Sequence, residues 1–291
     1  MNVRPATRDD AAAVAEVFAA VERSALGRSS FDEEAVLGWW QTIAFETNTW
    51  LIEEDGAPVA AAGAQVHGGR GSAAGAVHPS AQGRGLGSRL VDLVEARMRE
   101  EGAPRLHSWT VAGDEAASAL LASRGYREVR RFWDMAIDLE EEPAQPTVEI
   151  ETFREEDAPA FHAANEEAFE DHWEPHPETF DDWWSRQQAR ENYDPSLWFL
   201  IRDGDEVAAI ARNESRASGG YVGSLGVRRE WRGRGYGRAL LLHSFREFHR
   251  RGMRRATLGV DASNPTGATH LYESVGMHVE LETIVWEKAL T

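Results

Sequence analysis

The sequence predicts an α/β (α+β) protein made of two similar domains in tandem, each a mixed β-sheet flanked by helices. A glycine-spaced loop, "QGRGLG" at residues 82–87, returns as "RGRGYG" at residues 232–237. Strand-like and helix-like stretches alternate within each half, and Asp-Gly turns require antiparallel neighbours in the sheet. Positions that correspond in unlike elements keep offsets of 148, 150, 150 and 151 residues, namely Gly56/Gly204, Val77/Val227, Gly85/Gly235 and Gly125/Gly276.

The expected elements follow the same order in each half. An acidic cluster suited to a helix N-terminus opens an apolar-periodic helix after Arg8 and again after Arg154. A tryptophan-rich helical region follows, and then "WLIEEDG" from Trp50 and "WFLIRDG" from Trp198 each predict a strand that runs into a hairpin turn. The glycine loop, a long helix, a strand, another helix and a final strand complete each half.

The stretch between the halves reads as a linker. Residues 139–149 combine an acidic run with two prolines and lack apolar alternation. We therefore expect an N-terminal domain at residues 1–139, a linker at 140–147 and a C-terminal domain at 148–291.

Composition narrows the class of protein. Hydrophobic residues make up 42% of the 291 positions, which is enough for packed cores. Forty-nine acidic against thirty-one basic residues leave a formal charge of −18, which argues against nucleic acid or an anionic membrane as a partner. No apolar run reaches the roughly 18 residues of a membrane span, and the N-terminus lacks a signal-peptide pattern, so we expect a cytoplasmic protein. We expect a monomer or a homodimer.

The repeated loop predicts an anion-binding turn. A diphosphate needs several backbone N–H donors that point one way, and a glycine turn followed by a helix N-terminus supplies them. In the second half a helical pattern begins at Tyr236, directly after the turn, and Arg232 and Arg234 can add charge-assisted hydrogen bonds. A purely structural turn is the alternative interpretation. The G-x-G-x-G spacing fits neither an NTPase phosphate loop nor a dinucleotide-binding fold.

Two motifs together resemble the acetyl-CoA signature of the GNAT N-acetyltransferases. Arg232-x-x-Gly235-x-Gly237 follows a strand, and "NPTGATHLYESVGM" at residues 264–277 comes about thirty residues later. The first motif recurs in the first half, so the resemblance covers nearly the whole chain as two GNAT domains. Tandem domains of this kind are similar to the mycothiol synthases and to other duplicated bacterial acetyltransferases. The resemblance implies acetyl transfer from acetyl-CoA on centrally splayed β-sheets.

The resemblance also implies which residues bind acetyl-CoA. Backbone groups at the end of a strand would hold its pantetheine, the loop amides would hold its diphosphate, and an asparagine would bond the cofactor arm. In the second half these residues are Leu225, Gly226, Val227, Arg232, Gly233, Arg234, Gly235, Tyr236, Gly237 and Asn264. In the first half they are Val77, Gln82, Gly83, Arg84, Gly85, Leu86 and Gly87.

The resemblance places Tyr272 near the sulfur of acetyl-CoA, as the general acid. A phenol within hydrogen-bond reach can protonate the departing thiolate, whereas a packed aromatic side chain is the alternative interpretation. Glu214 is a weaker candidate for the general base. Because the chain has no cysteine, an acetyl-cysteine intermediate is excluded and we expect direct attack in a ternary complex. In the first half Leu121 occupies the position of Tyr272, so we expect that half to be catalytically degenerate.

The acceptor is expected to be a primary amine of a small molecule. Carboxylates beside aromatic rings suit a cationic amine, and tryptophans packed on a sheet beside solvated acids are the alternative interpretation. The candidate acceptor residues are Glu170, Asp171, His172, Trp173 and Tyr221. A non-catalytic sensor or scaffold that binds acyl-CoA remains the alternative function.

Two details limit the acceptor site further. His172 and His176 stand four residues apart, but Pro175 interrupts the helix between them, so we expect no metal. In mycothiol synthases an acidic residue opens the strand that Tyr221 opens in this chain. This departure argues against the mycothiol precursor as the acceptor.

Overall fold

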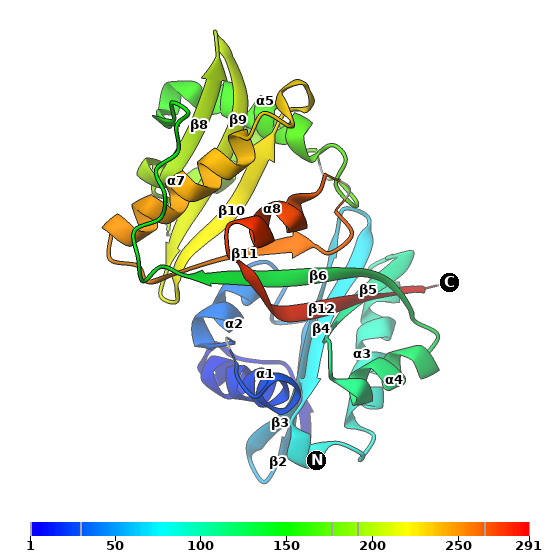
Figure 1. The fold of residues 1–291 in the computed structure, drawn as a ribbon. Helices are drawn as coiled ribbons and strands as arrows, with labels where there is room; N and C mark the ends of the chain where they lie inside the picture. Colours follow the sequence, from blue (N-terminus) through cyan, green and yellow to red (C-terminus); the bar gives the residue numbers. More distant parts are fainter. Residues whose placement is uncertain (1, 30, 176, 191, 265, 291) are drawn as a thin grey trace. The chain divides into compact units, whose positions relative to one another are not determined.

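The computed structural model describes residues 2–29, 31–175, 177–190, 192–264 and 266–290. They form two compact units (Figure 1). Unit 1 holds the residues up to Arg131 together with those from Leu281 onward, and unit 2 holds Phe132–Glu280. Among the helices of these residues, none combines the length and apolar character needed to cross a membrane.

Unit 1 contains a mixed sheet in the strand order β1-β2-β3-β4-β5-β12. Helices α1 and α2 pack on it through a cluster that includes Val14, Val36 and Leu51, and α3 packs on it through a second cluster that includes Leu90 and Leu106. The elements are β1 (Asn2–Arg4), α1 (Ala11–Leu26), α2 (Glu33–Trp40), β2 (Thr49–Glu54), β3 (Ala57–His67), β4 (Arg70–Val77), α3 (Leu86–Glu100), β5 (Arg105–Val111), α4 (Glu115–Ser123) and β12 (His278–Ala289).

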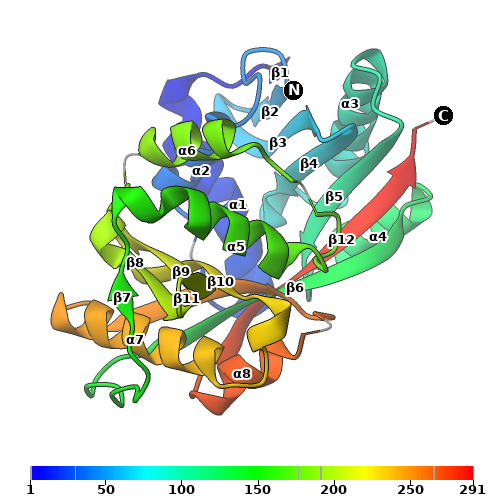
Figure 2. The ribbon, with the colours of Figure 1, turned by 90° about the horizontal axis from the view of Figure 1, so that it is seen from above.

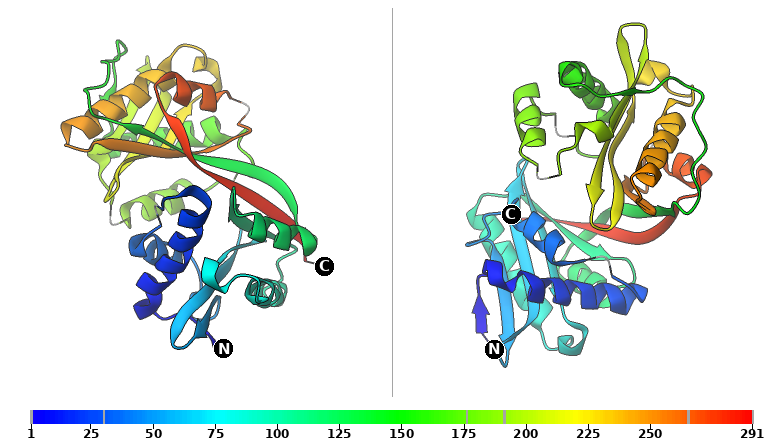
Figure 3. Two further views of the ribbon diagram at one scale, coloured as in Figure 1. Left: turned by 60° about the horizontal axis from the view of Figure 1, so that its bottom comes forward. Right: turned by 90° about the vertical axis from the view of Figure 1, so that its left-hand side faces the viewer.

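Unit 2 contains strands in the order β6-β11-β10-β9-β8-β7, again with both parallel and antiparallel pairs. Helices α5 and α6 lie on one face of this sheet and α7 and α8 on the other (Figures 2 and 3). The elements are β6 (Arg127–Asp138), β7 (Glu151–Thr152), α5 (Ala158–Phe169), α6 (Phe180–Gln188), β8 (Trp198–Asp203), β9 (Glu206–Arg216), β10 (Gly219–Val227), α7 (Tyr236–Arg250), β11 (Arg255–Asp261) and α8 (Ala268–Ser274). The predicted fold class, α/β with a mixed sheet in each half, is confirmed.

Local sequence explains the turns that join these elements. Asp55 and Gly56 both have positive φ angles, 50° and 81°, which suits the tight turn between β2 and β3. Gly204, with a φ of 63°, takes the same place between β8 and β9. Gly252 follows the end of α7 with a φ of 82°, a conformation that favours glycine. The hairpins and the helix end predicted from the sequence are therefore present.

The two halves of the sequence exchange their last strands. Most of β6, from the first half, pairs within unit 2, and most of β12, from the second half, pairs within unit 1. Within unit 2, residues 132–138 of β6 pair antiparallel with β11, from Phe132 opposite Asp261 to Asp138 opposite Arg255. Within unit 1, residues 283–289 of β12 pair antiparallel with β5. The units therefore depart from the boundaries expected from the sequence, because the chain crosses over at these two strands.

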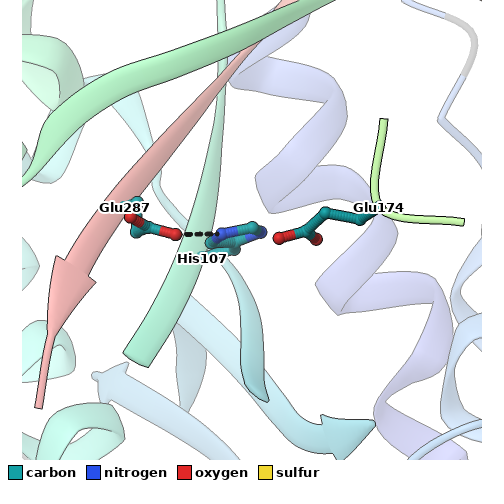
Figure 4. Close-up of side chains that lie close together, drawn as sticks. All are labelled: His107, Glu174 and Glu287. Atoms are coloured by element: carbon teal, nitrogen blue, oxygen red, sulfur yellow. Dashed lines mark hydrogen bonds and ion pairs between the residues drawn. The ribbon is translucent and has the colours of Figure 1, made fainter. Parts of the chain in front are cut away.

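A buried histidine marks the pairing of β5 with β12 in unit 1. The His107 side chain is fully buried on β5, and its Nε2 lies 2.9 Å from Glu287 Oε2 on β12 (Figure 4). Arg105 donates to the same carboxylate oxygen at 3.1 Å. The hydrogen bond to His107 and the charge of Arg105 hold the pKa of Glu287 below its usual range.

Truncation of Trp286 tests the exchange of strands. Its side chain packs in the core of unit 1, and its Nε1 donates to Thr110 Oγ1 at 2.9 Å. We expect Trp286→Ala to lower the free energy of unfolding by about 3–5 kcal/mol, because it leaves a cavity and an unpaired hydroxyl. Urea denaturation measures the loss, and hydrogen exchange should locate it in β5.

The control for this variant lies on the same strand. Val279 is 40% exposed, so Val279→Ala should change the free energy of unfolding by less than about 0.5 kcal/mol. Faster exchange in β11 with β5 unchanged would contradict the strand order given for unit 1.

Candidate active site

The sheet of unit 2 is split between β10 and β11. These parallel strands are in register at only two positions, Gly220 opposite Ala256 and Tyr221 opposite Thr257. A bulge follows at Gly223, where a side chain would meet the Arg212 guanidinium at 2.8 Å. Beyond the bulge the strands separate, and residues 222–227 and 258–261 line a cavity of about 340 Å³. Backbone groups of β10 that would otherwise pair with β11 are thus available to a ligand.

The glycine loop forms the mouth of this cavity. Gly233 and Gly235 have φ angles of 78° and 83°, which side chains rarely adopt, and α7 begins directly after them at Tyr236. Gly237 packs against α8, where an added Cβ would lie 3.2 Å from Leu271 Cδ2. The first amides of α7 therefore stand at the mouth with the positive end of the helix, which is an anion-binding arrangement.

Both arginines of the loop are paired with protein groups. Arg232 donates to the Val227 carbonyl at 3.2 Å, to the Ala168 carbonyl at 3.3 Å and to Asp171 at 3.2 Å. Arg234 donates to the Glu230 carbonyl and to a carboxylate on β8, each at 3.2 Å. The sequence suggested that these two side chains bond a diphosphate. In the structure Arg232 braces the loop against the end of β10 and the end of α5, and Arg234 braces it against β8.

Tyr272 lines the cavity from α8. Its side chain is only 7% exposed, and burial raises the pKa of its phenol to about 12. The phenol is therefore protonated at neutral pH. Asn264 also lines the cavity, and its Oδ1 accepts from the Thr266 backbone N–H at 2.8 Å and the Thr266 hydroxyl at 2.5 Å. These hydrogen bonds between Asn264 and Thr266 lie shortly before α8, the helix that carries Tyr272.

The structure does not place Glu214 where a general base is needed. Its side chain is buried on β9, outside the residues that line the cavity. It accepts from Arg190 and Arg212, each at 2.6 Å, and from Asn192 at 3.0 Å. Burial would raise the pKa of this carboxyl, but the arginines outweigh burial and hold the pKa below its usual range. Glu214 is therefore a structural ion-pair partner, and the weak candidacy drawn from the sequence is corrected.

Two of the five candidate acceptor residues reach the cavity. Asp171 and His172 line it just beyond the end of α5. Asp171 is paired with Arg229 and Arg232, and these hydrogen bonds hold the pKa of its carboxyl below the usual range. His172 Nδ1 lies 3.2 Å from the Trp173 carbonyl, so the proton sits on that nitrogen.

The other three candidate residues lie around the cavity rather than in its wall. Glu170 is exposed, 3.6 Å from Arg229. The Trp173 ring packs against Phe132, with centroids 6.0 Å apart. The Tyr221 ring carries the Arg216 guanidinium 3.3 Å above its centroid. His176 lies outside the described residues.

The structure adds residues that the sequence did not single out. Ser224 on β10, Phe169 at the end of α5 and Asp261 at the end of β11 all line the cavity. Asp261 is buried, and its Oδ1 accepts from the Ser263 backbone N–H at 2.8 Å. For Asp261, its position at the end of a largely apolar strand was the one feature of the sequence that could have indicated a place in the site.

Unit 1 repeats the loop in detail. Gln82 donates to the Val77 carbonyl at 3.4 Å, as Arg232 does to Val227. Arg84 donates to the Ser80 carbonyl at 2.9 Å and to a carboxylate on β2 at 2.7 Å, which matches the two bonds of Arg234. Five of the loop residues expected from the sequence line a cavity of about 380 Å³, as does Val77 before them; these five are Gln82, Gly83, Gly85, Leu86 and Gly87.

The cavity of unit 1 differs at its inner end. Strands β4 and β5 stay in register for four pairs, as far as Ala74 opposite Trp109, and β4 carries no bulge against β3. Leu121, buried on α4, lines this cavity at the position where Tyr272 lines the other. The two halves thus share a mouth and differ where the chemistry would take place.

Comparison with known proteins gives a consistent result. Residues 13–126 and 150–277 match the profile of the family described as Acetyltransferase (GNAT) family. A mycothiol acetyltransferase from Thermobispora bispora is 34% identical over 212 residues, which cover 69% of this chain and 70% of that protein.

Solved structures extend the likeness over the whole chain. A GCN5-related N-acetyltransferase from Sphaerobacter thermophilus has a TM-score of 0.90 at 33% identity, over 99% of this chain and 95% of that one. A tandem GNAT protein from the clavulanic acid biosynthesis pathway shares the fold, with a TM-score of 0.72 at 16% identity over 100% and 98% of the two chains.

Replacement of Glu214 tests its role as an ion-pair partner. Glu214→Gln leaves Arg212 and its neighbours without a buried negative charge, so we expect the free energy of unfolding to fall by about 3 kcal/mol at pH 7. Because the native pKa is lowered, this stabilisation is present above the unfolded pKa of about 4.3 and is lost as the pH falls below it. Chemical denaturation at pH 7 and pH 3.5 measures both values.

The matched control is an exposed ion pair in the same unit. Glu156 is 73% exposed and lies 3.5 Å from Arg154, so Glu156→Gln should have almost no effect. A loss for Glu214→Gln that is equal at the two pH values would contradict the assigned role.

Proposed function

This chain belongs to the acetyltransferase (GNAT) family, and we propose that its unit 2 transfers an acetyl group from acetyl-CoA to a primary amine of a small molecule. The family and the tandem arrangement expected from the sequence are confirmed by the two matched regions. The chain is therefore an acyltransferase. The acceptor, the acid and the order of events form our proposal.

We assign the donor site to the split between β10 and β11. The pantetheine amides would pair with the free backbone edge of residues 224–227, and the diphosphate would accept from the amides of residues 233–237. Support comes from the two positive φ angles at Gly233 and Gly235, which leave those amides at the head of α7. Asn264, in the same cavity, would bond the cofactor arm.

We assign the general acid to Tyr272, and this residue carries the proposal. The amine nitrogen attacks the thioester carbon, the carbon–sulfur bond breaks, and the phenol gives its proton to the departing thiolate. A backbone N–H of β10 would polarise the acetyl oxygen during attack. Support comes from the burial of the phenol in the cavity wall and its raised pKa, which keeps the proton in place until the thiolate forms.

We assign the acceptor side to the end of α5. Phe169, Asp171 and His172 stand there in the cavity wall, an aromatic ring beside a carboxylate and an imidazole. This combination suits a cationic amine, and the formal charge of −18 raises the local concentration of cations. One relative is named a mycothiol acetyltransferase. For this chain we propose only that the acceptor is a small molecule with a primary amine.

Release of CoA thiol in the presence of a panel of small primary amines tests the function directly. We expect thiol release that depends on both the amine and acetyl-CoA. If acetyl-CoA binds and no amine in a broad panel causes release, the protein is an acyl-CoA sensor or scaffold rather than an enzyme.

Removal of the phenol hydroxyl tests the general acid. Tyr272→Phe should lower kcat by about a hundredfold or more, because the thiolate then leaves unprotonated. The binding of acetyl-CoA should be nearly unchanged, since the ring remains. Tyr126→Phe, which removes the hydroxyl of the one tyrosine in the first half, is the control and should keep most of the turnover. A larger loss in this control than in Tyr272→Phe would contradict the assignment of the acid to Tyr272.

The pH dependence of kcat tests the same residue independently. A phenol with a pKa raised to about 12 stays protonated from neutral pH to about pH 10. We therefore expect no alkaline decline in kcat over this range from loss of the acid. A decline with an apparent pKa near 10 that disappears in Tyr272→Phe would contradict the burial of the phenol.

A further inference from the structure

The cavity of unit 1 has the mouth of an acyl-CoA site. Gly83 and Gly85 have φ angles of 75° and 79°, and α3 begins immediately after them, at Leu86. Gly87 packs against α4, where an added Cβ would lie 2.8 Å from Leu120 Cδ2. The first backbone amides of α3 thus follow a glycine turn as the first amides of α7 do. Unpaired amides at a helix N-terminus suit a diphosphate in both units.

This cavity has no group to carry out transfer. Leu121 replaces the acid, and Tyr126 is the single tyrosine of the first half. Burial and the neighbouring Glu95, which shares a hydrogen bond with its hydroxyl, raise the pKa of Tyr126 well above the usual range. The Tyr126 hydroxyl is thus already engaged by the Glu95 carboxylate.

The cavity of unit 1 also lacks the acceptor side. Within the described part of the chain no residue of α1 or α2 lines it, whereas residues at and just beyond the end of α5 line the cavity of unit 2. The groups proposed to hold the amine in unit 2 thus have no counterpart from α1 or α2 in the lining of this cavity.

Residues of α3 line this cavity instead, and Figure 1 shows α3 within unit 1. Leu90, Val91 and Val94 of α3 and Leu106 at the start of β5 line the inner end of the cavity, all apolar. From Gly87 to Val94 the helix rises about 10 Å. Small side chains complete the wall on the strands, namely Ala62, Ala73 and Ala74.

The cavity of unit 2 is lined by a shorter part of its helix. Helix α7 lines its cavity only with its first three residues, Tyr236, Gly237 and Arg238. Further along α7, Phe245 and Phe248 are fully buried. They stand 150 positions after Glu95 and Met98, so that unit 2 has aromatic rings where unit 1 has a carboxylate and a thioether. These rings take up more of the space beneath the helix than the side chains at the matched positions of unit 1.

We infer that unit 1 binds an acyl-CoA thioester with a medium-length saturated acyl chain and holds it without transfer. The amides of residues 83–87 would take the diphosphate, and the acyl chain would lie beneath α3 against Leu90, Val94 and Leu106. Each methylene that leaves water for this wall strengthens binding, and an acetyl group is too short to reach it.

Titration calorimetry on the full chain tests this inference, with octanoyl-CoA, acetyl-CoA, CoA and octanoate as ligands. A matched pair of loop variants separates the two sites. Gly85→Val and Gly235→Val each place a side chain at a φ of about 80°, at positions with open space around the Cβ, so each disturbs one loop without crowding a core. Circular dichroism checks that both variants fold.

We expect Gly235→Val to retain a site that binds octanoyl-CoA at least about tenfold more tightly than acetyl-CoA. Gly85→Val should lose that site. Octanoate without CoA should bind at least about tenfold more weakly than its thioester, since the diphosphate contacts are missing. Octanoyl-CoA recovered from the Gly235→Val protein should be intact by mass spectrometry.

Leu121→Tyr provides the second test, because it installs the larger side chain that unit 2 carries at the matched position. In the Gly235→Val background this change should abolish the preference for octanoyl-CoA while CoA itself still binds. Equal affinity for CoA, acetyl-CoA and octanoyl-CoA in the Gly235→Val protein would overturn the inference. So would the loss of all binding in that protein, or octanoate that binds as tightly as octanoyl-CoA.

Discussion

The separation of β10 from β11 is the constraint on which the rest of unit 2 depends. Two parallel strands that pair only at Gly220 and Tyr221 leave backbone donors and acceptors unmatched along the remainder of β10. The bulge at Gly223 makes the separation possible, and the glycine loop then turns the chain so that α7 starts at the open edge. A ligand with amide groups along an arm that is joined to a diphosphate satisfies both features together. CoA has that composition, because its two-amide pantetheine arm is attached to a diphosphate.

The duplication supplies an internal comparison. Both loops have glycines with positive φ angles at matched positions and repeat the same hydrogen bonds to the preceding strand. The halves differ in a few side chains: Leu121 against Tyr272 at the inner end, and Met98 against Phe248 under the helix. The strands differ as well, since β10 carries a bulge and pairs with β11 at two positions, whereas β4 carries none and pairs with β5 at four. In our proposal these differences separate a site that transfers an acyl group from one that only holds it.

Sequence reasoning succeeded where the physics is local. Positive φ angles at Gly233 and Gly235 and the hairpin at Gly56 follow from residue types within a few positions. The resemblance to the GNAT motifs, rather than spacing alone, implied the place of Tyr272 in the cavity. Sequence reasoning failed where partners come from far along the chain. The crossing of β6 and β12 between the units cannot be read from the sequence, because both strands have similar apolar patterns and either fits either sheet. The sequence offered Glu214 as a candidate general base. Tertiary folding brings Arg190 close to it, and the two residues form an ion pair.

A crystal structure of the full chain with bound acetyl-CoA tests the central claim most directly. The account predicts the diphosphate against the amides of residues 233–237, the pantetheine along the open edge of β10, and the thioester sulfur within about 3.5 Å of the Tyr272 hydroxyl. A thioester that lies away from Tyr272, or a cofactor that leaves the gap between β10 and β11 empty, would contradict it.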